Sequence, residues 1–459
     1  MSVVVLRGGP PVHPWIYSKR VHDVDGRPKD GDVVSLKTRE GRPCGFGFWH
    51  SRSLIAVRVL SVLPERPPDE AWLVERIREA ARLRTEVLHL PDVTDAWRAC
   101  HGESDGLSGL VVDRYGPAAS VSLYSIGWFR RMEEVARVLR AELGVRDVFA
   151  RTDERTATME GFRCEPPRDA GRVVIQEHGT KYVVDLAGGH KTGFFLDQRD
   201  HRDLVARISR GRRVFDGMTY TGGFAIAAAA RGQPKSVVAM DLDEIALEMG
   251  AENARKNGVQ VEFRHGDVFD ELRAMVGRPP EERPEVLIVD PAKWAKERAA
   301  LGAAMAKYAD LNRLALTAVA PGGVVLTCSC SGLVAPDDFV GMLRGVALDL
   351  RTDLRFLHVG GAAPDHPVSS TFPEGRYLKC VLVAPGTPGE GPGRSERPEG
   401  PDRGERGDRR DRGGRSGAGR RDPPRDGRDG EPRPEGGGPA APEGDLPPDL
   451  DAPPDLDAR

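Results

Sequence analysis

The chain is poor in cysteine, in aromatic residues and in long apolar runs. Six cysteines are scattered over 459 residues, which argues against a disulfide framework and favours a reducing cytosol. The segment from Met1 to Gly8 does not combine a basic region with a long apolar core, so we expect no secretory leader. No segment approaches the ~20 apolar residues of a membrane span. We therefore expect a cytoplasmic protein with no membrane partner.

The C-terminal part of the chain lacks aromatic residues altogether. All six tryptophans precede residue 386, and beyond it Gly, Pro, Arg, Asp and Glu make up nearly everything. Such a segment cannot bury enough apolar surface to offset the entropy of ordering, so we predict that 386–459 is disordered. The near balance of 67 basic and 70 acidic side chains hides an Arg/Gly/Asp-rich segment at 403–428 and an acidic end.

The remaining chain begins with β-strand patterns and continues with mixed ones. The strand candidates of residues 1–66 are 32–37, 44–49 and 54–60. Turn residues separate them, which predicts a small barrel. A helical stripe over 71–90 predicts a connecting helix, and residues 92–170 mix strand patterns with one helix.

From about residue 188 the pattern becomes an alternation of strands and helices. The strand candidates are 213–215, 236–240, 262–264, 286–289, 324–326 and 378–384. Helical stretches lie between most of them, an order that predicts a mostly parallel, doubly wound sheet. A β-hairpin around His178-Gly179 is expected just before this region.

A glycine-containing loop follows the first of these strands. Asp216 ends the strand, and Gly222 and Gly223 lie where the next helix is expected to begin. Glycine lets the backbone approach a ligand, and a helix N-terminus favours negative groups. The spacing is not that of a dinucleotide-binding motif, and a glycine loop alone is often a plain turn.

Acidic residues stand at the ends of the next two strands. Asp241 follows the second strand, where a carboxylate can accept hydrogen bonds from both ribose hydroxyls of a nucleoside. Taken alone, Asp241 can equally be a helix N-cap. Asp267 follows the third strand and can accept a hydrogen bond from an adenine amino group. Three acids and a glycine loop at successive strand ends together favour a nucleotide-type cofactor pocket.

Two further motifs bring reactive side chains toward the same pocket. Asp290 stands between a strand and Pro291, where it can bind a flipped base or simply initiate a turn. Cys328 and Cys330 follow the apolar run 322–326. We expect the two cysteines to point to opposite faces of the strand, so that at most one of the two thiols faces the pocket directly. A cysteine in a strand is most often a small buried hydrophobe, and no second close Cys/His pair supports a metal site.

Eight short stretches occur in a characteristic order along the chain. They are His13-Pro14-Trp15, Gly102 to Leu107, Glu177-His178-Gly179, Gly189 to Arg199, Tyr220 to Phe224, Asp290-Pro291, Ser329 to Leu333 and Asp365-His366-Pro367. In this order they resemble the bacterial class I S-adenosylmethionine-dependent rRNA methyltransferases of the large-subunit cytosine-C5 type. The resemblance covers residues 1 to about 385. The chain departs from it at Ala292, where a second proline is usual, and in the tail.

The resemblance implies an α/β fold with S-adenosyl-L-methionine as the cofactor. Its implied parts are a PUA-like RNA-binding barrel at 1–66, a connecting helix and central α/β module at 67–187, a Rossmann-like methyltransferase domain at 188–385 and the tail at 386–459. The implied partner is large-subunit rRNA or its assembly intermediate, and a homodimer is compatible with it. The cofactor-binding candidates are Asp216, Tyr220, Gly222, Gly223, Asp241, Asp267, Asp290, Gln198 and Arg199. The RNA-binding candidates are His13, Trp15, Arg20 and Lys191.

The resemblance also makes Cys330, rather than Cys328, the catalytic thiol, and Asp290 the second catalytic residue. A thiolate that attacks C6 of cytosine makes C5 nucleophilic enough to take a methyl group. Asp290 would hold or help protonate the N3 edge of the base. The target must leave its stack or lie in a single strand for these atoms to meet. The sequence does not identify the base that removes the C5 proton.

Two other functions stay open at this point. One is methylation of an exocyclic amine such as guanine N2, with Cys330 structural and with Asp290-Pro291-Ala292 and Trp294 forming the pocket. The other is a non-catalytic RNA-binding or assembly factor. Ala292 and the Arg/Gly-rich segment fit that function, but the complete set of cofactor acids argues against it.

Overall fold

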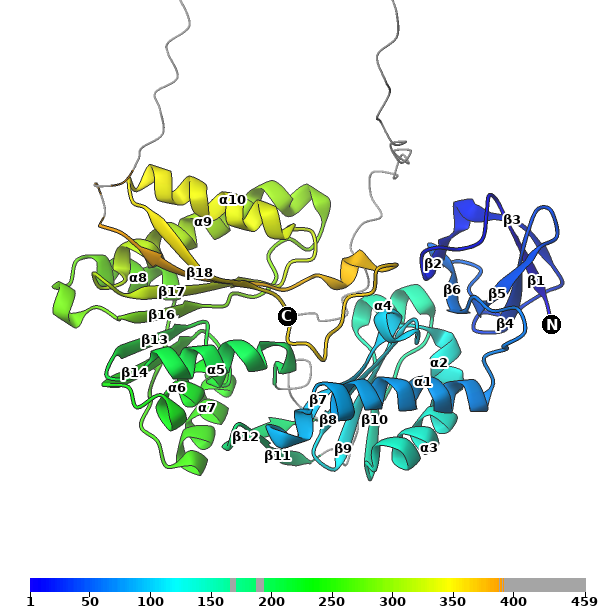
Figure 1. The fold of residues 1–459 in the computed structure, drawn as a ribbon, viewed down its shortest axis with the longest axis horizontal. Helices are drawn as coiled ribbons and strands as arrows, with labels where there is room; N and C mark the ends of the chain where they lie inside the picture. Colours follow the sequence, from blue (N-terminus) through cyan, green and yellow to red (C-terminus); the bar gives the residue numbers. More distant parts are fainter. Residues whose placement is uncertain (166–170, 187–193, 388, 390, 392–459) are drawn as a thin grey trace, which may run out of the picture. The chain divides into compact units, whose positions relative to one another are not determined.

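The computed structural model of the protein describes residues 1–165, 171–186, 194–387, 389 and 391 (Figure 1). Within this part the strands form sheets of six, four, two and seven members. The predicted disordered segment 386–459 lies mostly outside the described residues. The division of the chain at residues 66, 187 and 385 stays a prediction.

The N-terminal strands form one six-stranded sheet with the order β2-β6-β5-β4-β1-β3. Their bounds are β1 (Val3–Leu6), β2 (Trp15–Tyr17), β3 (Val21–Asp25), β4 (Val33–Thr38), β5 (Pro43–Trp49) and β6 (Ile55–Ser61). Close strand approach explains a glycine in β5, because a Cβ at Gly45 would lie 1.9 Å from the carbonyl oxygen of Ser61. The three predicted strands are present, whereas the short β1, β2 and β3 were not predicted.

The central part is a four-stranded sheet of order β10-β9-β8-β7 with helices packed on it. Its elements are α1 (Glu70–Arg82), β7 (Ala96–His101), β8 (Leu110–Tyr115), β9 (Ala118–Leu123), α2 (Ile126–Arg130), α3 (Met132–Leu143), β10 (Asp147–Arg151) and α4 (Glu154–Glu160). The helix predicted over 71–90 changes character after Arg82 and continues as a π-helical turn, Leu83–Val87. The side chain of Arg84 in this turn is completely buried.

The C-terminal sheet has seven strands in the order β15-β14-β13-β16-β17-β19-β18. Their bounds are β13 (Arg213–Gly217), β14 (Ser236–Asp241), β15 (Glu262–His265), β16 (Val286–Val289), β17 (Val324–Ser329), β18 (Leu354–Gly360) and β19 (Lys379–Pro385). The first five strands in this order are parallel, and β19 runs antiparallel to them. The edge strand β18 is antiparallel to β19 and therefore runs in the direction of the first five. The mostly parallel sheet is confirmed. The predicted hairpin precedes it as β11 (Arg172–Glu177) and β12 (Thr180–Asp185).

Helices cover both faces of this sheet, as Figure 1 shows. On one face lie α5 (Arg199–Ile208), α6 (Gly223–Arg231) and α7 (Glu244–Asn257); on the other lie α8 (Val268–Val276), α9 (Leu301–Ala318) and α10 (Pro336–Asp349). Separate apolar clusters fill the two interfaces. The chain order reverses between β13 and β16, and ligands of such sheets bind at the carboxyl ends of the strands beside this reversal.

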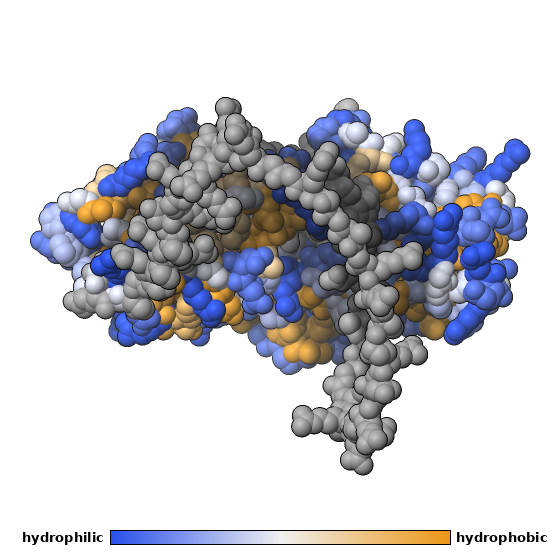
Figure 2. All heavy atoms as spheres, turned by 90° about the horizontal axis from the view of Figure 1, so that it is seen from above, coloured by the Kyte–Doolittle hydropathy of each residue, from blue (hydrophilic) through white to orange (hydrophobic). Residues whose placement is uncertain are grey.

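Polar residues dominate the visible described surface, with smaller apolar areas between them (Figure 2). Among the described residues, no helix combines the length and apolar character needed to cross a membrane. Two of the exposed apolar side chains, Leu242 and Ile245, follow the end of β14.

A cluster of buried charges, which we call the buried joint, links the central part to the C-terminal part. It consists of Arg84, Arg98, Arg199 and Asp365. The Asp365 carboxylate accepts hydrogen bonds from the Arg199 guanidinium at 2.7 and 3.2 Å and from the Arg98 backbone N–H at 2.9 Å. Arg84 donates to the Asp365 carbonyl oxygen at 2.7 Å. Residues far apart in the sequence are therefore held together by paired charges rather than by apolar packing alone.

Candidate functional site

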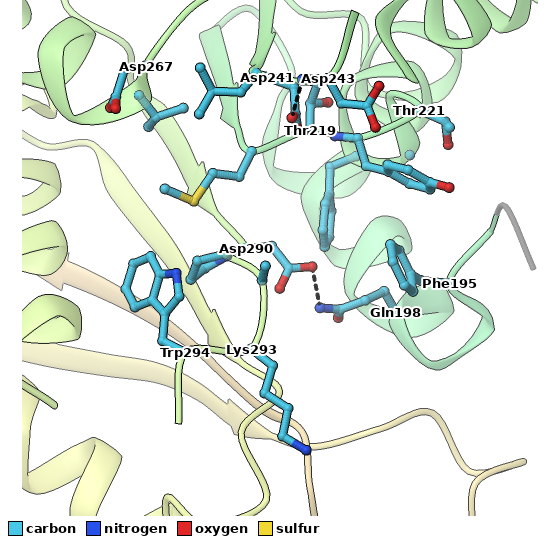
Figure 3. A pocket seen from close by; sticks show the side chains of 18 of the residues that line it. Phe195, Gln198, Thr219, Thr221, Asp241, Asp243, Asp267, Asp290, Lys293 and Trp294 are labelled. Atoms are coloured by element: carbon cyan, nitrogen blue, oxygen red, sulfur yellow. Dashed lines mark hydrogen bonds between the residues drawn. The ribbon is translucent and has the colours of Figure 1, made fainter. Parts of the chain in front are cut away.

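A pocket of about 1220 Å³ opens at the carboxyl ends of β13, β14, β15 and β16. The reversal in strand order places it there, because neighbouring helices turn to opposite faces and leave a gap. Figure 3 shows polar and aromatic side chains entering the pocket from several of these loops. Of the predicted cofactor residues, Gln198, Tyr220, Gly223, Asp241, Asp267 and Asp290 line it.

Asp241 follows β14 and is held by the backbone of two loops. Its Oδ2 accepts a hydrogen bond from the Tyr220 N–H at 2.7 Å, and its Oδ1 accepts one from the Asp243 N–H at 3.0 Å. The N-cap of α7 is Asp243, which accepts from the Ala246 N–H. The carboxylate of Asp241 is therefore not the helix cap, and it lies on the pocket wall.

Tyr220 lies in the glycine loop, and its backbone contacts the Asp241 carboxylate at the end of β14. Its backbone has a φ of 51°, a left-handed conformation that the hydrogen bond to Asp241 helps to hold. Burial raises the pKa of the Tyr220 phenol to about 12, so the hydroxyl stays neutral. The Phe195 ring lies 5.3 Å from the Tyr220 ring, and both line the pocket.

Asp267 has two roles in the described structure. It lies on the pocket wall, and it is the N-cap of α8, where its Oδ1 accepts from the Phe269 N–H at 2.7 Å. Its side chain is exposed, so oxygen lone pairs stay available to a ligand. In Figure 3 it lies at one end of the pocket, with Trp294 below it.

The glycine loop is supported from beneath by Asp216. Gly222 has a φ of 84° and precedes the first turn of α6, and a Cβ there would come within 3.0 Å of the Ile226 side chain. Asp216 is completely buried, and its Oδ2 accepts hydrogen bonds from the Thr219 hydroxyl at 2.5 Å and the Ala225 N–H at 2.9 Å. Neither Asp216 nor Gly222 is among the pocket-lining residues. Asp216 on β13 and Gly222 before α6 instead shape the loop between these two elements.

Asp290 leaves the end of β16 and meets Gln198, which lies just before α5. The Gln198 Nε2 donates to the Asp290 Oδ2 at 3.0 Å, as the dashed line in Figure 3 shows. Lys293 and Trp294 follow Asp290 and also line the pocket. The Lys307 ammonium lies 4.3 Å from the Trp294 ring, a cation–π contact on an aromatic wall.

Two of the predicted residues lie elsewhere. Arg199 is almost completely buried in the buried joint, where it pairs with Asp365 instead of lining the pocket. Cys330 follows the end of β17, is 1% exposed, and packs with Tyr377 and Leu378. It is not among the pocket-lining residues either.

Cys328 occupies a different environment from Cys330. It is completely buried in the apolar cluster between the sheet and α5 and α6, and its Sγ lies 3.0 Å from the Sγ of Cys380 on β19. The two thiols of the motif thus belong to separate clusters. Strand alternation does not explain this separation, because residues two apart on one strand share a face. β17 ends at Ser329, so Cys330 lies beyond the strand that holds Cys328.

The predicted RNA-binding residues differ in accessibility. Arg20 is partly exposed, and its guanidinium donates to the carbonyl oxygens of Arg7 and Gly9. His13 is partly exposed, 3.3 Å from Glu374. Trp15 is buried, and its indole N–H donates to the Glu103 carboxylate at 2.7 Å, so it acts as core. Lys191 lies outside the described residues.

Several pocket residues were not predicted from the sequence. The central part contributes Asp153, Glu154 and Arg155, and the C-terminal part contributes the charged residues Arg273, Lys307 and Asp310. Asp153 shows a helix-cap pattern, because it accepts from the Thr156 N–H at the start of α4. Nothing in that local pattern indicates that this helix start reaches a pocket built mainly by another sheet.

Known families match two regions of the chain. Residues 140–367 match a family described as S-adenosylmethionine-dependent methyltransferase, and residues 12–62 match a PUA-like domain. Two similar curated proteins carry the name ribosomal RNA large subunit methyltransferase I. That of Aeromonas salmonicida is 38% identical over 381 residues, covering 81% of this chain and 95% of the relative. That of Shewanella denitrificans is 34% identical over 380 residues, with the same coverage of 81% and 95%.

Solved structures match the fold over most of the chain. A methyltransferase crystallised in complex with SAH has a TM-score of 0.69 at 18% identity, covering 83% of this chain and 100% of that one. An S-adenosylmethionine-dependent methyltransferase from Streptococcus mutans has a TM-score of 0.67 at 18% identity, covering 83% and 99%. The predicted fold, a Rossmann-like domain preceded by a PUA-like one, is confirmed.

Proposed function

The chain belongs to the ribosomal RNA large subunit methyltransferase I family, and we propose that it methylates C5 of a cytosine in large-subunit rRNA. Membership makes it an S-adenosylmethionine-dependent rRNA methyltransferase. The choice of C5, the roles of individual residues and the form of the RNA substrate are the proposal. Because the members of this family are named as methyltransferases, the alternative of a non-catalytic assembly factor is disfavoured.

The residues of the pocket fit S-adenosylmethionine. Asp241 offers carboxylate oxygens for the ribose hydroxyls, and the exposed Asp267 offers one for the adenine amino group. The N-terminus of α6 at Gly223 lines the pocket and suits the carboxylate of the methionine part, because the first backbone N–H groups of a helix favour anions. When bound, this cofactor supplies the methyl group.

One observation carries the proposal: Asp290 and Cys330 leave neighbouring parallel strands at the same edge of the sheet. Val289 of β16 pairs with Thr327 of β17, so Asp290 is one residue and Cys330 three residues beyond this pair. Parallel strands deliver the residues that follow them to one edge. A carboxylate for the polar edge of a base and a thiol for its C6 therefore come from adjacent strand ends.

The thiolate of Cys330 would add to C6 of the flipped cytosine and increase the electron density at C5. Asp290, held by Gln198, would bind the N3 edge and favour its protonation during this attack. After methylation, loss of the C5 proton and elimination of the thiolate restore the aromatic base and the enzyme. Because Cys330 is 1% exposed, attack requires that the RNA-bound protein uncover this thiol.

A covalent trap tests this mechanism. In RNA containing 5-fluorocytosine at the target, the C5 substituent cannot leave as a proton, so the wild-type protein should stay attached to the RNA. Denaturing electrophoresis detects the adduct, and peptide mapping should place it on Cys330. Cys330→Ala should form no adduct and transfer no methyl group, while binding S-adenosylmethionine normally.

Cys328→Ala is the matched control, because Cys328 lies on β17 and is buried in the apolar cluster beneath α5 and α6, apart from Cys330. It should retain much of the activity once its folding has been checked by thermal unfolding. An active wild-type enzyme without an adduct, or a fully active Cys330→Ala variant, would contradict thiolate catalysis.

One observation favours a second candidate, methylation of an exocyclic amine such as guanine N2. Trp294 lines the pocket four residues after Asp290, whereas Cys330 does not line it. An aromatic ring near an acidic residue can stack a base while the carboxylate binds its amino group. Mass spectrometry of nucleosides from RNA methylated by the protein distinguishes 5-methylcytidine from N2-methylguanosine.

We also propose that the N-terminal sheet contributes to RNA affinity through phosphate contacts. The partly exposed Arg20 is its described candidate, while the buried Trp15 supports the fold. Each phosphate contact releases counterions, so Arg20→Ala should lower the slope of log affinity against log salt by about 1. Arg20→Lys, which keeps the charge, is the control, and an unchanged slope for Arg20→Ala would remove this residue from the interface.

A further inference from the structure

Gln198 connects the pocket to a buried histidine behind it. Its side chain is 1% exposed and makes two hydrogen bonds at its two ends. Nε2 donates to the Asp290 Oδ2 at 3.0 Å, and Oε1 lies 2.6 Å from the Nδ1 of His201. His201 is on α5, one turn beyond Gln198, and is itself buried.

Chemistry fixes the direction of both hydrogen bonds. An ionised carboxylate only accepts, so the amide end of Gln198 that faces Asp290 must be the NH₂ group. The oxygen of Gln198 then faces His201, and the Nδ1 of His201 must carry a proton to donate to it. A histidine without that proton would turn a lone pair toward the Gln198 oxygen. The amide would be repelled, and its contact with Asp290 would be lost or reversed.

A thiol on the far side of the ring holds His201 in this protonation state. Cys380 on β19 is completely buried, and it pairs in register with Gly360 of β18, beside which the His201 Nε2 lies. The Nε2 of His201 faces β18, because a Cβ at Gly360 would come within 3.1 Å of it. The other titratable groups that face His201 are Asp197 and Asp200 on its own side and His358 on β18, whose ring lies 5.3 Å away.

Either charge state of the thiol and imidazole keeps the required proton. Although burial raises the pKa of the Cys380 thiol, the hydrogen bond from Cys328 and the nearby His201 lower it overall, to about 6. Burial lowers the pKa of His201, but Cys380 and the two aspartates raise it overall. In a thiolate–imidazolium pair both ring nitrogens are protonated. In a neutral pair Nε2 accepts from the thiol and Nδ1 keeps the proton.

We propose that His201 is a positioning residue for methyl transfer, which orients the Gln198 amide and thereby fixes the Asp290 carboxylate in the pocket. Cys380 acts behind it by selecting the protonation of the ring. This inference rests on the proposed role of Asp290 toward the base. It adds that the orientation of Asp290 depends on a chain of contacts that runs through Gln198 and His201 to Cys380 on β19.

Two amide substitutions at position 201 test the chain of hydrogen bonds. His201→Asn places an N–H where Nδ1 stands and should retain the donation to Gln198. His201→Gln places its amide nearer to the position of Nε2 and should lose it. Total methyl incorporation into large-subunit rRNA gives kcat and KM for each variant. We expect a fall in kcat of ~10–100-fold for His201→Gln, because misplacement of a catalytic group by about 1 Å has effects of this size. For His201→Asn we expect a kcat near wild type.

Two measurements separate positioning from damage to the fold. Thermal unfolding of the two variants should show similar midpoints, since both replace a buried imidazole by an amide. The dissociation constant for S-adenosylmethionine should change little, because His201 is not among the pocket-lining residues. His358→Asn serves as a control, since the His358 ring on β18 contacts the His201 ring edge to face. It should leave kcat unchanged.

Specific outcomes would overturn the proposal. Equal kcat values for His201→Asn and His201→Gln would show that the Nδ1 proton does not matter. A His201→Gln variant whose KM rises while its kcat stays at the wild-type value would show the same. If His201→Gln proves unstable, Cys380→Ser against Cys380→Ala replaces it. Ser keeps a hydroxyl donor toward Nε2 and should preserve kcat better than Ala.

Failure of this inference and failure of the cytosine-C5 function give different results. Total methyl incorporation counts methyl groups on any base, so the His201 comparison holds even if the product is an exocyclic amine. Nucleoside analysis identifies the base independently. A normal 5-methylcytidine product with no difference between the two variants would reject only the positioning role.

Discussion

Asp365 in the buried joint and Asp216 beneath the pocket are both completely buried carboxylates, yet their neighbours differ in kind. Asp365 accepts two hydrogen bonds from the Arg199 guanidinium and one from the Arg98 backbone N–H. Asp216 accepts from the Thr219 hydroxyl and the Ala225 N–H through one oxygen. Its other oxygen has no hydrogen-bond partner within the described part of the chain. One carboxylate is neutralised by a cation and the other is solvated by dipoles alone.

The two surroundings shift the two pKa values in opposite directions. Burial raises the pKa of Asp365, but His366 and Arg199 outweigh it and hold that pKa well below its ordinary value. At Asp216 burial prevails over the two hydrogen bonds, and Asp290 and Asp241 add repulsion, so its pKa rises to about 7. The buried joint is thus built around a permanent charge. The pocket floor carries an acid that changes its charge near neutral pH.

The largest expected effect comes from removing the charge of Asp365. Asp365→Asn leaves the buried Arg199 guanidinium without its hydrogen-bonded carboxylate, and the half-exposed Asp200 at 3.6 Å is a weaker partner. Breaking one partner of a buried pair costs about 3–5 kcal/mol, so the free energy of unfolding should fall by that amount. Urea unfolding measures it.

The surface pair between the exposed Arg78 and the partly buried Glu142 provides the comparison for this first variant. Arg78→Ala should change the free energy of unfolding by less than ~1 kcal/mol, because exposed ion pairs contribute little. An Asp365→Asn variant as stable as Arg78→Ala would show that the buried joint does not hold the two parts together.

The next effect concerns the pH dependence of stability at Asp216. The native pKa of about 7 lies above the ordinary value of 3.8, so the folded state binds the proton more tightly than the unfolded state. This contribution is fully present below pH 3.8 and is lost as the pH rises through about 7. At about 1.4 kcal/mol per pKa unit, the loss amounts to about 4 kcal/mol at most.

Asp216→Asn removes this titration while keeping an oxygen for Thr219 and Ala225. Its free energy of unfolding should therefore decline less than that of the wild type between pH 5 and 8 in urea titrations. Asp365 makes the opposite contribution, which is lost only as the pH falls below its ordinary range. Parallel pH profiles for wild type and Asp216→Asn would contradict the raised pKa of Asp216 and the contrast drawn between Asp216 and Asp365.

A smaller effect is expected where the pocket meets its ligand. Asp241→Ala removes the acceptor proposed for two ribose hydroxyls and should weaken S-adenosylmethionine binding by ~1–3 kcal/mol in calorimetry. Asp270→Ala, on the exposed face of α8, should bind normally. Because Asp241 also holds the Tyr220 N–H, thermal unfolding of the same variant must show whether the loop stays intact. Unchanged affinity would remove Asp241 from the site.

The sequence predicts the regular parts of the fold well, since periodicity depends on neighbouring residues. Strands such as β13, β16 and β19 are short, mostly buried and rich in apolar residues, and they were found to within two residues. The edge strand β18 was missed, because its half-buried and exposed residues alternate without a continuous apolar run. The early strands β1 and β2 are too short to show a period.

Prediction of the site succeeded where residues follow strands and failed where distant segments meet. Asp241, Asp267 and Asp290 line the pocket because strand ends of a parallel sheet converge. Arg199 was expected beside the cofactor, but its partner Asp365 is 166 residues away and no local pattern reveals the pairing. For the same reason, the contribution of Asp153 to the pocket could not be read from its sequence neighbours.

The smallest expected effect separates the two roles of Asp267, and it extends the comparison to a carboxylate at the pocket rim. As the N-cap of α8 it accepts from the Phe269 N–H, and as a pocket residue it is proposed to accept from an adenine amino group. Asp267→Ala should cost ~1 kcal/mol of unfolding free energy, the usual value of a cap, and should weaken S-adenosylmethionine binding several-fold. Asp267→Asn keeps an oxygen for both tasks and should resemble the wild type in both measurements.

The matched control is Asp69→Ala, which removes the N-cap of α1, where Asp69 accepts from the Trp72 N–H at 2.9 Å. It should lose similar stability without any loss of affinity, because α1 does not line the pocket. If Asp267→Ala behaves like Asp69→Ala in both assays, the carboxylate serves only the helix, and the adenine amino group must find its acceptor elsewhere.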